Sequence, residues 1–220
     1  MKKLLSLLLS LTLLCSLAAC SGATTSSSGN GTSKPASEAP VESGESSGSE
    51  ALNESTDPTD NTGATLIAYF SWSGNTEHLA QMIQAETGGT LFEIAPATPY
   101  TEDYDTLLDV AQQEQRDNAR PELASQVENW DSYSVVFVGY PDWWSDAPML
   151  IYSFLESYDW EGKTLIPFCT SGGSGFGRSL DKLPDSAPGA AILEGLHVSG
   201  SSVEGAREDV SNWIGSLNIG

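Results

Sequence analysis

The stretch TLIAYFSWSGNT, residues 65–76, decides the fold of this chain. Its first half, Thr65 to Phe70, is apolar, β-branched or aromatic at nearly every position, as is typical of a strand buried on both faces of a parallel sheet. Its second half places three hydroxyl side chains, a glycine and an asparagine in six residues. A helical spacing of apolar residues follows at once, with Glu77 in the first turn, where the helix dipole favours an acid. The sequence therefore predicts a strand, a hydroxyl-rich turn and a helix in succession.

This succession indicates a phosphate-binding loop, because the unpaired N–H groups and the positive dipole end of the helix point at one spot. The chain has no Lys or Arg between Lys34 and Arg116, which argues against the lysine-bearing loop of nucleotide-triphosphate sites, and the GxGxxG pattern of dinucleotide sites is also missing. A small phosphate held by neutral donors remains, and the alternative is an ordinary turn with a Ser or Asn cap. The candidate residues are Ser71, Trp72, Ser73, Gly74, Asn75 and Thr76.

The N-terminal residues have the composition of a secretion signal. The 220-residue chain carries a net charge of −21, yet residues 1–20 hold Lys2 and Lys3 ahead of an apolar core and then small residues. The core is too short to span a bilayer as a stable helix. The sequence LAAC at 17–20 resembles the bacterial lipoprotein processing box, in which the cysteine is acylated; the alternative is a plain signal peptide. We expect lipidation at Cys20 and a domain anchored outside the cytoplasmic membrane.

Residues 21–63 are rich in Ser, Thr, Gly, Pro and acids, and Val41 and Leu52 are their only bulky apolar residues. Such a composition cannot bury enough surface to fold, so we expect a disordered linker with a root-mean-square span of roughly 35–40 Å. A linker of this kind suits a tether, since it holds a domain clear of the lipid headgroups.

Residues 64–220 are long enough to form one domain with its own core. They hold 23 Asp and Glu against 6 Lys and Arg, a net charge of −17, which argues against nucleic acid and anionic membrane surfaces as partners. Cys169 is the only cysteine among them, so neither an internal disulfide nor a cysteine-built metal cluster is expected. His78 and His197 have no partner at ligand spacing; we expect both on the surface or on a helix face, and no metal site.

The rest of the domain alternates apolar strand patterns with amphipathic helix patterns, which predicts an α/β fold with a parallel sheet. After the first helix, the predicted elements are strands at 90–95, 133–140, 163–170 and 190–198, and helices from 104 to before Pro121, at 148–158, near 179–183 and at 203–217.

Two further strand ends carry ligand-type residues, and the carboxyl ends of parallel strands share one edge of the sheet. The strand at 133–140 is followed by adjacent tryptophans, which either cover the core or form a wall for a flat aromatic ligand. The strand at 163–170 is followed by four glycines around a phenylalanine, which form either a flexible connector or a loop whose N–H groups meet a ligand. The candidate residues are Pro141, Asp142, Trp143, Trp144, Thr170, Ser171, Gly172, Gly173, Ser174, Phe176 and Gly177.

The SxSGNT sequence resembles the FMN-phosphate loop of the flavodoxin-like family. The resemblance to this family extends from about Ala64 to the C-terminus, and the PxWW and SGGSGFGR segments resemble one branch of the family. The family implies a three-layer sandwich around a five-stranded parallel sheet in the order 2-1-3-4-5, with FMN at the switch between strands 1 and 3. It also implies phosphate on the 71–76 loop and the flavin ring between the 141–144 and 170–177 loops. Asp142 departs from the apolar residue expected between the proline and the tryptophans.

This resemblance implies an FMN-binding electron-transfer protein tethered outside the cytoplasmic membrane, with a redox partner protein or a small electron acceptor. No catalytic Ser-His-Asp or Cys-His set is evident, so the cofactor would supply the chemistry. Two alternatives remain: an NAD(P)H-dependent flavin or quinone reductase, and a surface binding protein that has lost the flavin. We also expect Asp142 and Asp146 to disfavour an anionic reduced flavin and so to lower its potential.

Overall fold

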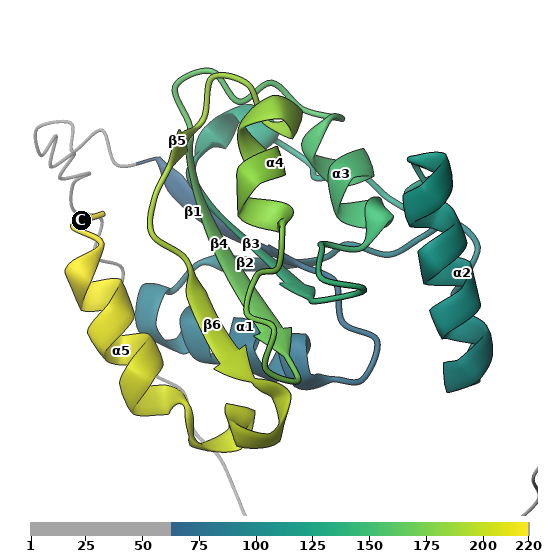
Figure 1. The fold of residues 1–220 in the computed structure, drawn as a ribbon. Coiled ribbons are helices and arrows are strands. Elements are labelled where there is room, and N and C mark those ends of the chain that lie inside the picture. The colour runs from purple at the N-terminus through teal and green to yellow at the C-terminus, as the bar shows by residue number, and fades with distance from the viewer. Residues whose placement is uncertain (1–62, 220) are drawn as a thin grey trace, which may run out of the picture. The chain divides into compact units, whose positions relative to one another are not determined.

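The computed structural model describes residues 63–219, so the predicted signal with Cys20 and the linker up to residue 62 lie outside the described residues. The described residues form a parallel sheet with helices on both faces (Figure 1). Its elements are β1 (Ala64–Tyr69), α1 (Asn75–Thr87), β2 (Thr90–Glu93), α2 (Tyr104–Asp117), η1 (Trp130–Ser132), β3 (Tyr133–Pro141), α3 (Met149–Leu155), β4 (Thr164–Ser171), α4 (Ser179–Ser186), β5 (Ala191–Ile192), β6 (Leu196–Ser199), η2 (Gly200–Gly205) and α5 (Arg207–Ser216).

The strand order is β2-β1-β3-β4-β5, and every strand pairing in the sheet is parallel. This confirms the α/β fold with the predicted order 2-1-3-4-5. The order reverses between β1 and β3, which are neighbours in the sheet although β2 lies between them in the sequence. Ligands of such sheets bind at this reversal, beyond the carboxyl ends of the strands.

The predicted last strand at 190–198 is split into β5 and β6, which both pair with β4, so the sheet has six strands. The Leu165 carbonyl accepts the Leu193 N–H at 3.0 Å, and strand alternation turns the nitrogen of Pro167 to the same side. That nitrogen carries no hydrogen and cannot continue the ladder. The pairing with β4 stops after Ile192 and resumes at Leu196. Gly195 lets the chain pass close to β4 between these points, since a Cβ there would lie only 2.7 Å from the Pro167 carbonyl oxygen.

Alternating strand residues build two separate cores, one on each face of the sheet. In β1, Leu66 and Ala68 pack into the core that includes α3, whereas Ile67 and Tyr69 pack into the core that includes α1 and α5. All four side chains are buried, as expected for a central strand covered on both faces. Figure 1 shows the resulting layers, with α1 and α5 on one side of the sheet and α3 and α4 on the other.

Gly139 in β3 tests this close packing. A Cβ at this position would overlap the ring of Phe168, its neighbour in β4. We expect Gly139→Ala to cost about 1–3 kcal/mol of unfolding free energy, because the buried ring has to leave its favoured position. Urea denaturation measures this cost. Phe168→Leu removes the ring that the new Cβ would meet. The double variant Gly139→Ala/Phe168→Leu should therefore lose less unfolding free energy than the sum of the losses in the two single variants. Losses that simply add would contradict this contact.

None of the helices between residues 63 and 219 has the length and apolar character needed to span a bilayer. Within the same residues, no group of three or more His, Cys, Asp or Glu side chains could hold a metal ion.

Candidate flavin-binding site

The three loops predicted to carry the site meet at one edge of the sheet, beyond β1, β3 and β4. The Thr76 hydroxyl at the start of α1 lies 2.8 Å from the Thr170 hydroxyl at the end of β4, and both side chains are buried. The Asp142 N–H donates to the Thr170 carbonyl at 2.9 Å. The Ser174 hydroxyl donates to Asp142 Oδ2 at 2.6 Å. Hydrogen bonds therefore join the three loops into one structure.

The loop between β1 and α1 has the features of an anion site. Gly74 caps α1 in the left-handed conformation, with φ of 86°, and supplies no side chain to the helix N-terminus. The first-turn N–H groups are thus left without a side-chain cap. The Ser71 hydroxyl is buried and has no hydrogen-bond partner within the described residues. An unpaired buried hydroxyl costs about 1–3 kcal/mol, and a bound phosphate would satisfy it together with the free N–H groups.

A pocket of about 510 Å³ opens directly on this loop. We call it the central pocket; it collects residues from four strand ends and from the start of α2. Its lining residues are Trp72, Ser73, Asn75, Tyr104, Pro141, Asp142, Trp143, Thr170, Ser171, Gly172, Ser199, Gly200 and Ser201. The volume lies within the range of cofactor and small-molecule sites.

Nine of the 17 predicted site residues line this pocket, whereas Ser71 lies outside its lining and Trp144 lines only a neighbouring pocket. Several of the others hold the pocket's loops in place. Phe176 packs its ring at 6.2 Å from that of Tyr140 and against Gly195. A Cβ at Gly177 would overlap the Ser145 backbone, so this glycine permits close contact between the loops after β3 and β4. Gly173 N–H donates to the Ser171 hydroxyl at 3.1 Å.

The two adjacent tryptophans have different environments. Trp143 is half-buried against the rings of Phe70 and Tyr100, at 5.3 and 5.2 Å, so it both covers the core and lines the central pocket. Trp144 is 45% exposed, and its indole N–H donates to the Leu108 carbonyl of α2 at 3.0 Å. Both alternatives from the sequence, core cover and pocket wall, therefore hold for Trp143.

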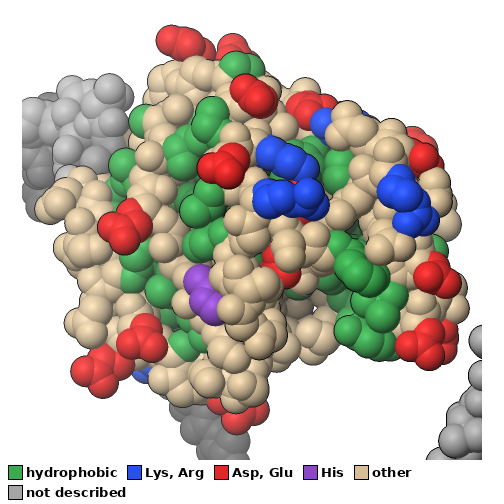
Figure 2. Space-filling view, in the orientation of Figure 1, with side chains coloured by type: hydrophobic (Ala, Val, Ile, Leu, Met, Phe, Trp, Pro, Cys, Tyr) green, Lys and Arg blue, Asp and Glu red, His purple; other side chains and the backbone are tan. Residues whose placement is uncertain are grey.

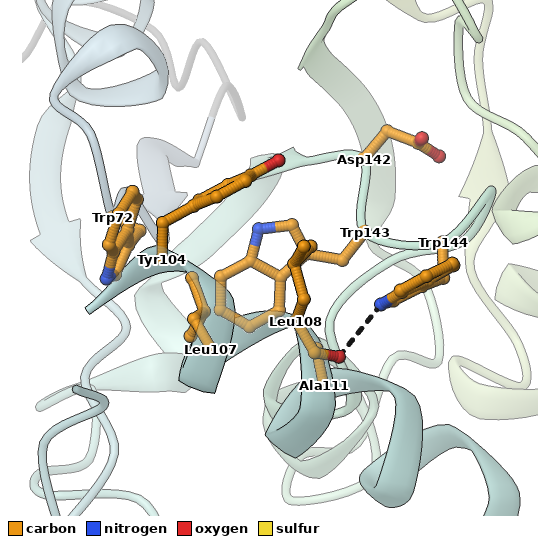
Figure 3. A pocket seen from close by; sticks show the side chains of 8 residues that line it. All are labelled: Trp72, Tyr104, Leu107, Leu108, Ala111, Asp142, Trp143 and Trp144. Carbon is orange, nitrogen blue, oxygen red and sulfur yellow. Dashed lines mark hydrogen bonds between the residues drawn. The ribbon is translucent and has the colours of Figure 1, made fainter. Parts of the chain in front are cut away.

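A second pocket of about 380 Å³ lies beside the central pocket, between α2 and the loop after β3 (Figure 3). We call it the apolar pocket. Its lining residues are Trp72, Tyr104, Leu107, Leu108, Ala111, Asp142, Trp143 and Trp144. Trp72, Tyr104, Asp142 and Trp143 belong to both pockets, so the two are contiguous.

The two aspartates of the loop after β3 point to different surroundings, which corrects the expectation that they act together on a flavin. Asp142 lines both pockets, and its Oδ1 is buried without a hydrogen-bond partner among the described residues. Asp146 lines neither pocket and is 0% exposed. It accepts from the Tyr152 hydroxyl at 2.6 Å and from the Lys182 ammonium, which places its charge in an ion pair under the loop.

Sequence reasoning missed the contribution of β6 and η2 to the site. Ser199, Gly200 and Ser201 line the central pocket, and a Cβ at Gly200 would lie 2.8 Å from the Asn75 amide nitrogen. The sequence could have indicated this contribution, because SGSS at 199–202 follows the last predicted strand and therefore lies at the same edge of the sheet. Tyr104 was also missed as a lining residue; as the first residue of α2 it is brought to the pocket only by tertiary structure.

His197, which was expected on the surface or on a helix face, is partly exposed in β6 and contacts the loop after β4. The Ser171 hydroxyl oxygen accepts N–H groups from Gly173 and Gly175, both at 3.1 Å, and lies 2.8 Å from His197 Nε2. A hydroxyl oxygen has two lone pairs. Because both are used, the Ser171 O–H donates to His197, whose Nε2 is the acceptor. His197 in β6 thus orients the hydroxyl that shapes the pocket-lining loop.

Replacing His197 by Phe should weaken FMN binding by about fivefold, because losing one hydrogen bond in the loop costs on the order of 1 kcal/mol. His197→Gln offers an acceptor oxygen to the same hydroxyl and should restore most of the affinity. Isothermal titration with FMN measures both. Equal affinities for the wild type and His197→Phe would show that the loop does not need this contact.

The electrostatic character of both pockets is set by the absence of cations. No Lys, Arg or His lines either pocket. Cys169 lies below the loop after β4, and burial raises the pKa of its thiol, so it is not a thiolate at neutral pH. The site can therefore bind and orient a ligand through neutral donors, aromatic rings and one carboxylate.

The fold and this site define an α/β protein with a phosphate-type loop and an aromatic wall at a topological switch point. Residues 64–217 match the family model described as flavodoxin. The chain therefore belongs to the flavodoxin family. A search of the curated proteins gives no match.

Solved structures support the same assignment. A protein from Bacteroides uniformis assigned as a flavoprotein is 37% identical, with a TM-score of 0.63, over 70% of this chain and 98% of that one. Another, from Bacteroides eggerthii, is 36% identical, with a TM-score of 0.60 and the same coverage of the two chains. A Lactobacillus acidophilus flavoprotein in complex with FMN is 23% identical over 65% of this chain and 97% of that one, with a TM-score of 0.54. The last likeness shows the fold alone.

Proposed function

We propose that this flavodoxin-like flavoprotein transfers electrons through bound FMN, outside the cytoplasmic membrane and tethered to it by a lipid on Cys20. FMN is the cofactor supported by membership of the flavodoxin family, and a relative of the same fold is an FMN complex. The observation that carries the binding mode is the buried, unpartnered Ser71 hydroxyl beside an uncapped helix N-terminus. This is an arrangement of donors that a phosphate monoester would satisfy.

The residues present fit the cofactor at both ends. Ser73, Asn75 and the first N–H groups of α1 would hold the phosphate, together with the unpartnered hydroxyl of Ser71. No cation is needed because the helix dipole favours the anion. Asp142 Oδ1 is a buried acceptor without a donor, and the flavin ring carries an N–H that could satisfy it.

FMN supplies one- and two-electron chemistry when bound. The chain's own residues then bind the cofactor, shield one side of it with Trp143 and set the charge around it through Asp142. NAD(P)H carries several negative charges, and with the FMN phosphate on the helix N-terminus neither pocket offers a cation for these further charges. This favours an electron carrier over the NAD(P)H-dependent reductase. The proposal includes a redox partner protein or a small electron acceptor that exchanges electrons with the bound flavin.

The test compares FMN with riboflavin, which lacks only the phosphate. We expect FMN to bind the purified full chain at least about 100-fold more tightly, because several charge-assisted hydrogen bonds depend on the phosphate. Isothermal titration gives the affinities, and the absorbance spectrum of the purified protein shows whether flavin is retained. Equal affinities would contradict the phosphate loop, and no binding of either would favour the binding protein that has lost the flavin.

The tether has a separate test. Cys20 follows small residues at the end of an apolar core, and two or more acyl chains are enough for stable anchoring where one is marginal. Cys20→Ser should therefore move the protein from the membrane fraction to the soluble fraction of its bacterial host. Immunoblots of the two fractions measure the shift. Wild-type protein found mainly in the soluble fraction would contradict the lipid anchor and leave the flavin proposal untouched.

A further inference from the structure

The apolar pocket lies against the central pocket but carries none of the phosphate-loop residues except Trp72. We propose that the apolar pocket binds an uncharged, flat aromatic molecule of the quinone class. This inference deepens the proposed function and rests on it, because it names the chemical class of the small electron acceptor. The alternative occupant is a nicotinamide dinucleotide, and the experiment below tests it with NADH.

The shape of the pocket favours a flat ring. Figure 3 shows Tyr104 and Trp72 at one end, Trp144 at the other and the Trp143 indole between them. Leu107, Leu108 and Ala111 of α2 form the aliphatic side. Four aromatic rings around about 380 Å³ leave room for a molecule of two or three rings and too little for a folded chain segment. Aromatic pairs contribute beyond their buried area when the rings are offset or tilted.

Contacts of the wall residues keep the pocket open between its two sides. The Trp72 N–H donates to the Thr101 carbonyl at 2.9 Å, and the Trp144 N–H donates to the Leu108 carbonyl at 3.0 Å. The Gln115 amide of α2 donates to the Trp143 carbonyl at 2.6 Å. The indole N–H groups of Trp72 and Trp144 are therefore used by the protein, and the ring surfaces facing the pocket are left for an apolar ligand.

Charge around the pocket selects a neutral ligand. Asp142 is its one charged lining residue, and no Lys or Arg balances it there. Residues 64–220 carry a net charge of −17, which further disfavours an anion. Figure 2 shows hydrophobic side chains gathered on this face beside α2. A neutral ring gives up much less hydration on entering such a site than a phosphate or sulfonate, whose charge would be buried there without a partner.

Because the two pockets are adjacent, a quinone in the apolar pocket would lie next to the flavin and could accept its electrons. They share Trp72, Tyr104, Asp142 and Trp143, so a ring in the apolar pocket and a flavin in the central pocket would contact the same side chains. The proposal requires that both ligands bind at the same time. The main control is therefore that the quinone probe does not displace FMN.

The experiment titrates the full chain, saturated with FMN, with two probes: 2-methyl-1,4-naphthoquinone and the anionic 1,4-naphthoquinone-2-sulfonate. Isothermal titration is the measurement. We expect the neutral probe to bind at least about tenfold more tightly than the sulfonate, because the latter has to bury a charge. NADH should show no binding. Displacement of FMN by the neutral probe would overturn the proposal, since the apolar pocket would then be part of the flavin site.

Two variants of α2 locate the bound probe. Leu108→Glu places a charge in the apolar pocket and should weaken the neutral probe by about tenfold or more. Val110→Glu makes the same change two residues away, at a 36% exposed position outside the pocket, and should change the affinity less than about twofold. Ala111→Leu, which fills the pocket without charge, should also weaken the probe.

The outcomes separate this inference from the function on which it rests. FMN affinity should be the same in Leu108→Glu, Val110→Glu and the wild type, which shows that both variants are folded, because neither residue lines the central pocket. Equal weakening of the probe by Leu108→Glu and Val110→Glu, or a failure of the neutral probe to bind the FMN-saturated chain, would overturn the inference and leave the FMN proposal standing. A chain that binds the neutral probe but not FMN would overturn the proposed function instead.

Discussion

Replacing Ser73 by Asp should weaken FMN binding by more than about 100-fold while leaving riboflavin binding almost unchanged. Ser73 lines the central pocket on the loop between β1 and α1, next to the left-handed Gly74 that caps the helix. A carboxylate about 5 Å from a phosphate is repelled by about 3 kcal/mol per pair of unit charges at an effective dielectric constant of 20. Isothermal titration with the two ligands measures the effect.

Ser73→Asn is the matched control, because asparagine has the shape of aspartate without its charge. Ser73 is exposed, so neither side chain has to fit into the core, and both variants should unfold at the wild-type urea concentration. We expect Ser73→Asn to lose less than about tenfold in FMN affinity, since the change removes one neutral donor. If the Asp and Asn variants lost the same affinity, the phosphate would have to bind elsewhere.

The positions of the three site loops in the fold could be predicted from the sequence, because each depends on residues close to it in the chain. The short, β-branched and aromatic run Thr65–Phe70 favours a buried strand, and the hydroxyl-rich turn after it favours a helix start, so the loop at 71–76 follows from neighbouring residues. The same holds for the loops after β3 and β4, because parallel strands bring their carboxyl ends together.

Features that depend on which way one backbone or side-chain group points could not be predicted from neighbouring residues. The split of the last strand follows from the side to which the Pro167 nitrogen points, and this is settled only by the pairing of β4. His197 reaches the Ser171 hydroxyl because β6 is in register with the end of β4. Asp142 and Asp146 are four residues apart in one loop, yet only one of them lines the pockets.

The difference between these two aspartates leads to a prediction with two opposite halves. Asp146 is 0% exposed, and its partners are the Tyr152 hydroxyl, the Ala147 N–H, the ammonium of Lys182 and, at 3.7 Å, the guanidinium of Arg178. Asp146→Asn removes the charged acceptor from this cluster and should lower the free energy of unfolding by about 1–2 kcal/mol, because the buried hydrogen bonds weaken while the two cations stay partly exposed to water. Urea denaturation measures this loss. The flavin potential should stay the same, since the charge of Asp146 is already paired and lies outside both pockets.

Asp142→Asn should do the reverse. Its carboxylate lines the central pocket, with Oδ1 unpartnered and Oδ2 bonded only to the Ser174 hydroxyl, so no cation balances it within the described residues. Electron transfer to FMN adds negative charge beside it, and each 1.4 kcal/mol of repulsion shifts a one-electron potential by about 60 mV. We therefore expect Asp142→Asn to raise the second-electron potential by about 60 mV with little change in stability, as measured by spectroelectrochemical titration. A shift in Asp146→Asn and none in Asp142→Asn would contradict the assignment, because the charge that controls the potential would then be the buried one under the loop.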